Sequence, residues 1–401
     1  MNKNAPQGWT ISNIDKTCLV LDSKRIPINS EERSARKGQY PYYGANGIQG
    51  YIDDYIFEGE HFLLAEDGGN FDQWESRPIS YLVSGKFWVN NHAHILKGKA
   101  GNETKFLHYS LVHKNITKHI NGGTRAKLNQ SDMRDIELAL PPLAEQKKIA
   151  AILSSVDDVI ESTQAKIHKL KDLKTGMMQE LLTTGIDHTE FKDCSVGKIP
   201  KSWKTAKIQD VASFITSGSR GWAEFYAKKG AIFIRIGNLT REHINFRLND
   251  IVYVNPPESG EGKRTLVQTG DVLISITADL GIIGVVYDGF GEAYVNQHVS
   301  LVRLKDTKLS RWVGHFLAHE NSQRQFSANN DAGAKAGLNL SAIRNLEIAL
   351  PPEIERERIV KALDSVDSTI ADLKIKLIKQ MDIKKALMQD ILTGIVRVKV
   401  N

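Results

Sequence analysis

The chain contains an internal duplication, and this feature restricts its possible folds more than any other. Residues 128–142 read Leu-Asn-Gln-Ser-Asp-Met-Arg-Asp-Ile-Glu-Leu-Ala-Leu-Pro-Pro, and residues 338–352 read Leu-Asn-Leu-Ser-Ala-Ile-Arg-Asn-Leu-Glu-Ile-Ala-Leu-Pro-Pro. Residue 141 therefore corresponds to residue 351, an offset of 210, which holds without a gap as far as Thr183 and Thr393. Chance does not produce an ungapped match of this length, so the chain is a tandem repeat.

Upstream of each shared block, the two copies keep common anchors but differ in the number of residues between them. Residues 59–64 match 270–275 at an offset of 211, and Val-Asn-Asn-His at 89–92 matches Val-Asn-Gln-His at 295–298 at an offset of 206. A scaffold that is kept while its loops vary is one way to redirect a recognition surface. Neutral drift of surface loops explains the same pattern equally well.

Each shared block leads into a long helical pattern whose apolar residues alternate at spacings of four and three, which is a coiled-coil seam. The seam residues are Leu153, Val156, Ile160, Ile167 and Leu170 in the first copy, and Leu363, Val366, Ile370, Leu373 and Leu377 in the second. Gly185 and Gly394 stand where C-terminal caps are expected. Two such stripes in one chain most simply bury each other, so we expect an antiparallel pair with the globular regions at opposite ends.

Lys174 and Lys384 occupy equivalent positions within this seam. A polar residue in a seam can set the register of the two helices. Alternatively, both lysines extend their charged ends to solvent near the end of the bundle, which is the commoner behaviour of such residues.

The two globular regions, 1–142 and 188–352, have the pattern of mixed, strand-rich domains, so the fold class is α+β. The expected strands are 62–65, 81–83, 231–236, 272–276, 282–287 and 299–304, and short helices are expected at 105–113 and 309–319. Together with the helical seams, this predicts a pseudo-twofold repeat of two domains joined by two long helices.

Basic, aromatic and amide residues alternate in one loop region of each copy. Such side chains contact phosphates and base edges in DNA complexes. The predicted DNA-binding residues of these regions are Arg25, Arg33, Arg36, Lys37, Tyr42 and Asn46, and then Ser219, Arg220, Lys228, Lys229, Arg235 and Asn238. Taken singly, each of these residues is more often solvated surface than a base contact.

A glycine-rich loop with basic residues precedes each shared block. It carries Arg125 and Lys127 in the first copy and Lys335 in the second, with Arg125 aligned to Lys335. Such a loop lets backbone N–H groups approach an anion, although a structural turn accounts for it equally well. We add these three residues to the predicted DNA-binding set.

Composition and motifs argue against several other classes of protein. The chain has 53 Lys and Arg against 47 Asp and Glu, a net charge of +6, which permits a nucleic-acid partner without demanding one. Two cysteines and no signal-peptide pattern predict a cytoplasmic protein. Asn255-Pro-Pro-Glu258 lacks the aromatic fourth residue of an amino-methyltransferase motif, and Gly262–Thr265 lacks a P-loop's spacing. His92 and His94 lack partners for a metal site, so we expect no bound metal. None of these motifs completes an active site, so we expect no catalysis.

The sequence resembles the specificity (S) subunits of type I restriction–modification systems over essentially its whole length. The second copy departs from the family pattern at 351–356, where it lacks the Leu and Gln of Pro-Pro-Leu-x-Glu-Gln. The residues that carry the resemblance are the two blocks at 128–142 and 338–352, Pro-Pro-Leu-Ala-Glu-Gln at 141–146, both heptad helices, and the openings Gly8-Trp9 and 200–203.

The resemblance implies two target recognition domains, 1–142 and 188–352, and two conserved helical regions, 143–187 and 353–401. Each domain would read one half of a split DNA sequence, and the helices would set the spacer and hold two modification subunits. Those subunits would bring S-adenosylmethionine and methylate adenine, and a restriction subunit would use ATP and Mg²⁺ to translocate and cleave DNA. The chain itself would be non-catalytic and would bind no cofactor.

Three other functions stay open at this point. The first is a specificity subunit of a complex that only methylates. A stand-alone adenine methyltransferase would need a cofactor fold, which this sequence lacks. A coiled-coil scaffold for other proteins would show no DNA binding even with a modification partner present.

Overall fold

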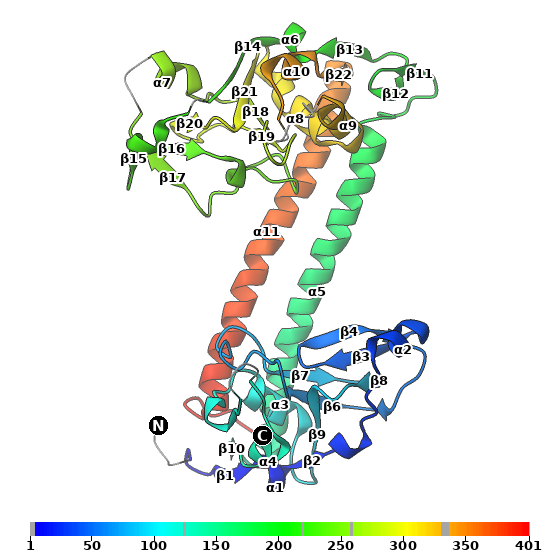
Figure 1. The fold of residues 1–401 in the computed structure, drawn as a ribbon, viewed down its shortest axis with the longest axis vertical. Coiled ribbons are helices and arrows are strands. Elements are labelled where there is room, and N and C mark those ends of the chain that lie inside the picture. The colour runs from blue at the N-terminus through cyan, green and yellow to red at the C-terminus, as the bar shows by residue number, and fades with distance from the viewer. Residues whose placement is uncertain (1–4, 123–125, 219, 257–259, 330–336, 401) are drawn as a thin grey trace. The chain divides into compact units, whose positions relative to one another are not determined.

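The computed structural model describes residues 5–122, 126–218, 220–256, 260–329 and 337–400. The chain divides into two compact units: unit 1 comprises 1–164 and 375–401, and unit 2 comprises 165–374. Each unit combines a strand-rich domain with parts of two long helices, α5 (Leu143–Leu181) and α11 (Glu353–Leu392) (Figure 1). The predicted α+β class is thereby confirmed.

The ends of α5 and α11 follow from local sequence. Each helix starts just after a Pro-Pro pair, and the carbonyl of the second proline accepts the first intrahelical bonds, for example from Glu145 N at 2.9 Å and from Arg356 N at 2.9 Å. Beyond the helices, Gly185 and Gly394 have φ values of 66° and 73°. This left-handed conformation is strained for residues with a Cβ, which is why glycine follows the C-terminal end of both helices.

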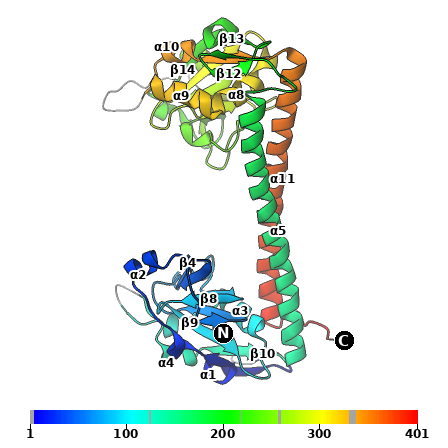
Figure 2. The same cartoon turned by 90° about the vertical axis from the view of Figure 1, so that its right-hand side faces the viewer.

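The two long helices pack against each other in antiparallel sense within each unit (Figure 2). In unit 1 the core brings Ile149 and Leu153, near the start of α5, together with Ile391, at the end of α11. In unit 2 the core brings Leu363, near the start of α11, together with Leu182, just after α5. Of the predicted seam residues, four are buried and six are partly buried: Leu153, Ile167, Leu363 and Ile370, and then Val156, Ile160, Leu170, Val366, Leu373 and Leu377.

Unit 1 contains two four-stranded sheets and a two-stranded ribbon. The first sheet has the order β2 (Cys18–Val20), β9 (Ala93–Gly98), β6 (His61–Ala65), β7 (Ser80–Val83), the second has the order β4 (Gly47–Ile52), β3 (Tyr40–Gly44), β8 (Lys86–Val89), β5 (Phe57–Glu58), and the ribbon pairs β1 (Thr10–Asn13) with β10 (Glu137–Leu140). The helices are α1 (Ile14–Thr17), α2 (Ser30–Ala35), α3 (Thr104–Val112) and α4 (Gln130–Arg134), with 3-10 turns at Asp22–Lys24 and Thr117–His119.

Unit 2 repeats this plan with additions. Its sheets have the orders β14 (Ala212–Ser217), β21 (Val299–Leu304), β18 (Val272–Ser275), β19 (Ile283–Val285) and β15 (Tyr226–Ala227), β17 (Val252–Val254), β16 (Ala231–Ile234), β20 (Ala293–Val295). Ribbons pair β13 (Lys204–Lys207) with β22 (Glu347–Leu350) and β11 (Phe191–Cys194) with β12 (Gly197–Pro200). The helices are α6 (Ile208–Val211), α7 (Gly260–Thr265), α8 (Ser310–Ala318), α9 (Glu320–Ala328) and α10 (Leu340–Asn345), with 3-10 turns at Trp222–Phe225, Ile236–Asn238 and Thr307–Leu309.

The duplication seen in the sequence is thus a duplication of topology. In each unit one parallel strand pair, β3 with β8 and β16 with β20, lies within an otherwise antiparallel second sheet. The six predicted strands correspond to β6, β7, β16, β18, β19 and β21, and the two predicted short helices to α3 and α8, so these predictions are confirmed within a few residues. The region 24–43, predicted as a loop, instead contains α2, which is capped by Asn29, and strand β3.

Candidate nucleic-acid interface

A polar groove of about 410 Å³ lies on the domain of unit 1. Four segments that are distant in the sequence form it: the start of α2, the hairpin between β3 and β4, the segment after β6, and the turn between β8 and β9. Its lining residues are Ile28, Asn29, Ser30, Arg33, Tyr42, Ala45, Asn46, Gln49, Asp67, Gly68, Asn90, Asn91 and His92. Amide and imidazole side chains of this kind both donate and accept hydrogen bonds, which suits base edges and phosphates.

Three predicted DNA-binding residues, Arg33, Tyr42 and Asn46, line this polar groove. The guanidinium of Arg33 lies 5.0 Å from the ring centre of Tyr42, and Tyr42 itself is only 1% exposed. Burial raises the pKa of the Tyr42 phenol, whose O–H donates to Ile28 O at 3.4 Å. The Tyr42 ring therefore packs against the guanidinium of Arg33 from the buried side. Asn46 is exposed and donates to Gly68 O at 2.9 Å.

Arg36 and Lys37 stand outside the groove lining. Arg36 forms an ion pair with Asp53 at 3.0 Å and lies 5.0 Å from the ring centre of Trp88, so it clamps the end of α2 onto the sheet. Lys37 is exposed. A contact from Arg36 to DNA would have to coexist with the Asp53 pair, which leaves Arg33 and Lys37 as the more available cations of this segment.

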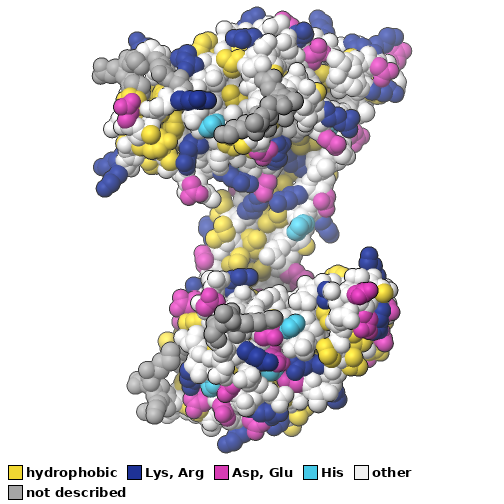
Figure 3. Space-filling model, in the orientation of Figure 1, with side chains coloured by type: hydrophobic (Ala, Val, Ile, Leu, Met, Phe, Trp, Pro, Cys, Tyr) yellow, Lys and Arg dark blue, Asp and Glu magenta, His cyan; other side chains and the backbone are white. Residues whose placement is uncertain are grey.

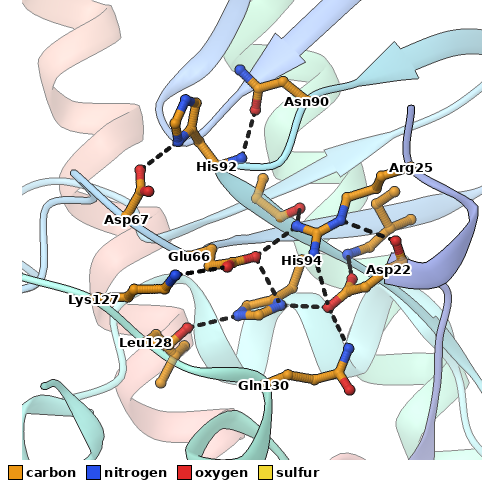
Figure 4. A network of polar contacts seen from close by, with 12 residues as sticks. Asp22, Arg25, Glu66, Asp67, Asn90, His92, His94, Lys127, Leu128 and Gln130 are labelled. Atoms are coloured by element: carbon orange, nitrogen blue, oxygen red, sulfur yellow. Dashed lines mark hydrogen bonds and ion pairs between the residues drawn. The ribbon is translucent and has the colours of Figure 1, made fainter. Parts of the chain in front are cut away.

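Arg25 and the exposed Lys127 belong to a polar network next to the groove, which has the buried residues Asp22 and His94 within it (Figure 4). Arg25 donates to Glu66 at 2.6 Å, and Lys127 Nζ lies 3.5 Å from the other oxygen of the same carboxylate. His94, fully buried, has its Nδ1 2.6 Å from Asp22 and its Nε2 2.9 Å from the carbonyl of Leu128. The network therefore joins β6, β9 and the strand-like segment at 127–128.

The three groups Asp22, Glu66 and His94 lie close enough together to be considered as a metal site, since their ligand atoms are within 4.8 Å of one another. Both imidazole nitrogens, however, already face hydrogen-bond acceptors, and the cations of Arg25 and Lys127 flank Glu66. Burial alone would raise the pKa of Asp22, but the hydrogen bond and charge of His94 outweigh it and lower that pKa. Because the ligand atoms are engaged, we assign this cluster to the scaffold.

The predicted residues of unit 2 are less concentrated. Arg220, Lys228 and Lys229 are exposed. Arg235 is half-buried and donates to Asp250 O at 3.3 Å. Asn238 is 3% exposed; its Oδ1 accepts from Arg235 N at 2.9 Å, and its amide donates to Arg247 O at 3.1 Å. A DNA contact from Asn238 would require both of these hydrogen bonds to break.

The predicted residues Arg125, Ser219 and Lys335 lie outside the described residues. Figure 3 shows Lys and Arg side chains spread over the visible face of the domain in each unit, with Asp and Glu among them. The charge distribution on this face is therefore mixed.

Several groove residues were not selected by the sequence analysis, namely Asn29, Gln49, Asn90, Asn91 and His92. The repeat contained a signal for three of them, because Val-Asn-Asn-His at 89–92 matches Val-Asn-Gln-His at 295–298. Asn29 and Gln49 had no comparable signal, since only the folding of α2 and the β3–β4 hairpin brings them to the groove.

The long helices carry two equivalent ion pairs. Lys174 on α5 lies 2.6 Å from Asp367 on α11, and Lys384 on α11 lies 2.6 Å from Asp157 on α5. Both lysines and both aspartates are related by the offset of 210. Because each lysine reaches the opposite helix rather than open solvent, this geometry favours the register-setting interpretation of the seam lysines.

A family model for the type I restriction modification DNA specificity domain matches residues 6–172 and 200–381. The chain is 27% identical over 373 residues to a Haemophilus influenzae protein assigned as a type I restriction enzyme specificity subunit, covering 88% of this chain and 86% of that one. It is 24% identical over 412 residues to the type I restriction enzyme MjaVIII specificity subunit of Methanocaldococcus jannaschii, covering 98% and 94%. The crystal structure of an S subunit from M. genitalium superposes with a TM-score of 0.65 at 14% identity, covering 98% and 97% of the two chains.

None of the helices in the described part of the chain is both long enough and apolar enough to cross a membrane.

Proposed function

The chain belongs to the type I restriction–modification DNA specificity family, and on that premise we propose that each of its two domains reads one half of a bipartite DNA target. A specificity subunit is a non-catalytic component of type I restriction–modification enzymes and binds no cofactor itself. We assign target recognition to residues 1–142 and 188–352, and the conserved helical regions to 143–187 and 353–401.

The observation that carries this proposal is that one scaffold is built twice with two different polar surfaces. The parallel strand pair recurs in both units, yet the segment after it differs. In unit 1 it is a hairpin that exposes Asn46 and Gln49, and in unit 2 it is a 3-10 turn that buries Asn238. Two different surfaces on equivalent frames suit two different half-sites.

The paired helices provide the spacer in this proposal. An α-helix of 39 or 40 residues extends for about 60 Å at a rise of about 1.5 Å per residue. Successive major-groove half-sites on one face of DNA recur every 34–36 Å or so. Removing 163–169 from α5 and the equivalent 373–379 from α11 would shorten the pair by about 10 Å, so we expect a spacer shorter by about three base pairs, or loss of assembly.

The complex would contain two modification subunits, which supply S-adenosylmethionine and methylate adenine, and restriction subunits, which use ATP and Mg²⁺. A solved structure concerned with complex assembly and conformational transition of the type I R-M system has the same fold, with a TM-score of 0.52 at 15% identity. We place this assembly on double-stranded DNA in the cytoplasm. A complex that only methylates would use this chain in the same way.

Methylome sequencing of cells that express this chain with its modification subunit tests the proposal. We expect one methylated sequence in two parts with a fixed gap. Arg33→Ala is expected to weaken or relax recognition of one half only, and Arg220→Ala of the other half only. A continuous methylated sequence, or the same half affected by both variants, would refute the assignment of one domain to each half. Methylation without restriction would identify the methylation-only complex.

A further inference from the structure

We propose that two equivalent turns, Asn90–His92 in unit 1 and Asn296–His298 in unit 2, are DNA-contacting elements that bind the sugar–phosphate backbone in the same manner in both domains. We call them the Asn-x-His turns. This inference rests on the proposed function and adds a role for residues that it leaves unassigned. Each turn places the amide of its middle residue beside an imidazole, and an amide N–H donates hydrogen bonds to phosphate oxygens.

The asparagine at the start of each turn is buried, and its side chain stabilises the turn through a hydrogen bond to the histidine backbone. Asn90 follows strand β8 and is 5% exposed, and Asn296 follows β20 and is 7% exposed. Asn90 Oδ1 accepts from His92 N at 2.9 Å, and Asn296 Oδ1 accepts from His298 N at 3.1 Å. Their backbone N–H groups donate across the parallel strand pair to β3 and β16, at 3.0 Å in both units. The same bonds therefore hold the same turn geometry twice.

Each histidine is then oriented through its Nδ1. In unit 1 this atom lies 2.6 Å from Asp67 Oδ1, and in unit 2 it lies 2.7 Å from Thr277 Oγ1. Residues 67 and 277 occupy equivalent places in the two units, because they form β-bridges with residues 127 and 337, which are related by the offset of 210. The carbonyls just before them accept from Leu128 N and Leu338 N in the same way. The carboxylate of Asp67 and the hydroxyl of Thr277 thus orient the imidazole in the same way, with Nε2 directed away from the asparagine at the start of the turn.

The middle residue supplies the donor. Asn91 is exposed, and no hydrogen bond joins its amide to another residue in the described ranges. Gln297, its equivalent, is half-buried, and its amide nitrogen donates to His298 Nε2 at 3.0 Å, so this ring orients the amide, whose second N–H is the phosphate donor of this turn. In unit 1 the turn forms one wall of the polar groove, with the imidazole tethered to Asp67 beside Lys127 and the network below it (Figure 4). Asn91 therefore lines the same groove as Arg33 and Asn46.

The comparison of the two units indicates which part of DNA these turns contact. The surrounding loops differ in length, since the offset changes from 211 to 206 and back to 210 around the turns. The groove residues Asn46 and Gln49 are exposed, whereas Asn238, in the segment that follows the equivalent strand of unit 2, is buried. The Asn-x-His turn is present in both units although the segments around it differ. It is therefore suited to contact a part of DNA that both half-sites share. Phosphates are common to every DNA sequence, whereas base edges are not.

The test uses the complex of the full chain with its modification subunits and two duplexes of equal length, one with the cognate sequence and one without. Asn91→Ala is the first variant, because its exposed side chain has no described partner whose loss would disturb folding. His92→Ala and His298→Ala follow, with unchanged thermal unfolding as the folding criterion. Asn91→Gln keeps an amide at the same place, as Gln297 does in unit 2, and is expected to retain most of the affinity.

We expect Asn91→Ala to weaken binding to both duplexes by about tenfold, as for removal of a hydrogen bond to a charged group, and His92→Ala and His298→Ala, which remove only the ring beside the amide, to weaken it by less. The ratio of the two affinities and the methylated sequence should stay unchanged. Because the Asn91 amide carries no charge, the slope of log K against log salt should stay unchanged in Asn91→Ala.

Unchanged affinity for both duplexes would overturn the inference, and so would a loss confined to the cognate duplex with relaxed sequence choice, which would identify a base contact. In both of these outcomes the wild-type complex still methylates a bipartite site, so the proposed function stands. A wild-type complex that binds neither duplex would instead refute the proposed function and, with it, this inference.

Discussion

Removing the charge of Lys174 is expected to destabilise unit 2 much more than removing that of Lys384 destabilises unit 1. Each ammonium group lies 2.6 Å from an aspartate on the opposite long helix. The side chains of Lys174 and Asp367 are only 10% and 4% exposed, whereas those of Lys384 and Asp157 are 25% and 37% exposed. Because the two pairs are equivalent in the repeat, one chain provides both the perturbation and its matched control.

The difference in burial determines the expected magnitudes. In Lys174→Met the carboxylate of Asp367 stays buried without a cation beside it, which costs about 3–5 kcal/mol. Its Oδ2 has no hydrogen-bond partner among the described residues, so that oxygen holds no other hydrogen bond that would remain after the change. In Lys384→Met, Asp157 still accepts a 2.7 Å hydrogen bond from the Tyr109 hydroxyl and remains partly solvated, so we expect a cost of about 1 kcal/mol or less.

Amide hydrogen exchange on the full chain measures the opening free energy of each unit separately, through peptides from 165–181 for unit 2 and from 376–392 for unit 1. The double variant Lys174→Met with Asp367→Leu removes both charges and should recover most of the loss seen in the single variant. Equal losses in Lys174→Met and Lys384→Met, within about 0.5 kcal/mol, would refute the reasoning. So would a double variant as unstable as Lys174→Met alone, because the cost would then not come from an unpaired charge.

Three further predictions concern the stability of the scaffold. Burial lowers the pKa of His108 to about 3; since the unfolded chain binds that proton near pH 6.5, stability is lost as pH falls below 6.5, by at most about 1.4 kcal/mol per pH unit. His108→Gln should therefore flatten the decline in melting temperature between pH 6.5 and 4.5, and an unchanged slope would contradict the assignment. The Arg397 guanidinium holds the pKa of Glu145 below its usual range, so Arg397→Ala should lower the melting temperature near pH 7 and lose this effect once the carboxylate is protonated in acid. Gly185→Ala should destabilise unit 2, because φ is 66° and the added Cβ would approach Glu355 Oε1 to 2.4 Å, and an unchanged melting temperature would exclude this strain.

Sequence periodicity was sufficient for the long helices and for the buried strands. The heptad spacing places Leu153 and Leu363 in the seam, and both are fully buried. Short apolar runs located β6 and β21, because the side chains are buried along all of β6 and along all of β21 except at Arg303. Helix α2 was missed, since it has no buried residue and therefore no apolar periodicity to detect.

The candidate interface was only partly accessible to such reasoning. Arg33 and Asn46 were selected because of their chemistry, and the polar groove contains both. The same reasoning also selected Tyr42 and Asn238, which the structure buries at 1% and 3% exposure. Residue type indicates what a side chain can bind, but burial depends on strand pairing with segments elsewhere in the chain.

The sequence by itself determined that this protein is a duplicated scaffold with two long amphipathic helices, because repetition and heptad spacing are properties of the order of residues. Only the tertiary structure decided which polar side chains share a groove and which lysine is buried against an aspartate. Asn29, Asn46 and Asn91 come from three separate segments, and Lys174 meets Asp367 across 193 positions of the chain. Such contacts arise when distant segments pack together, and no local pattern records the distance between them.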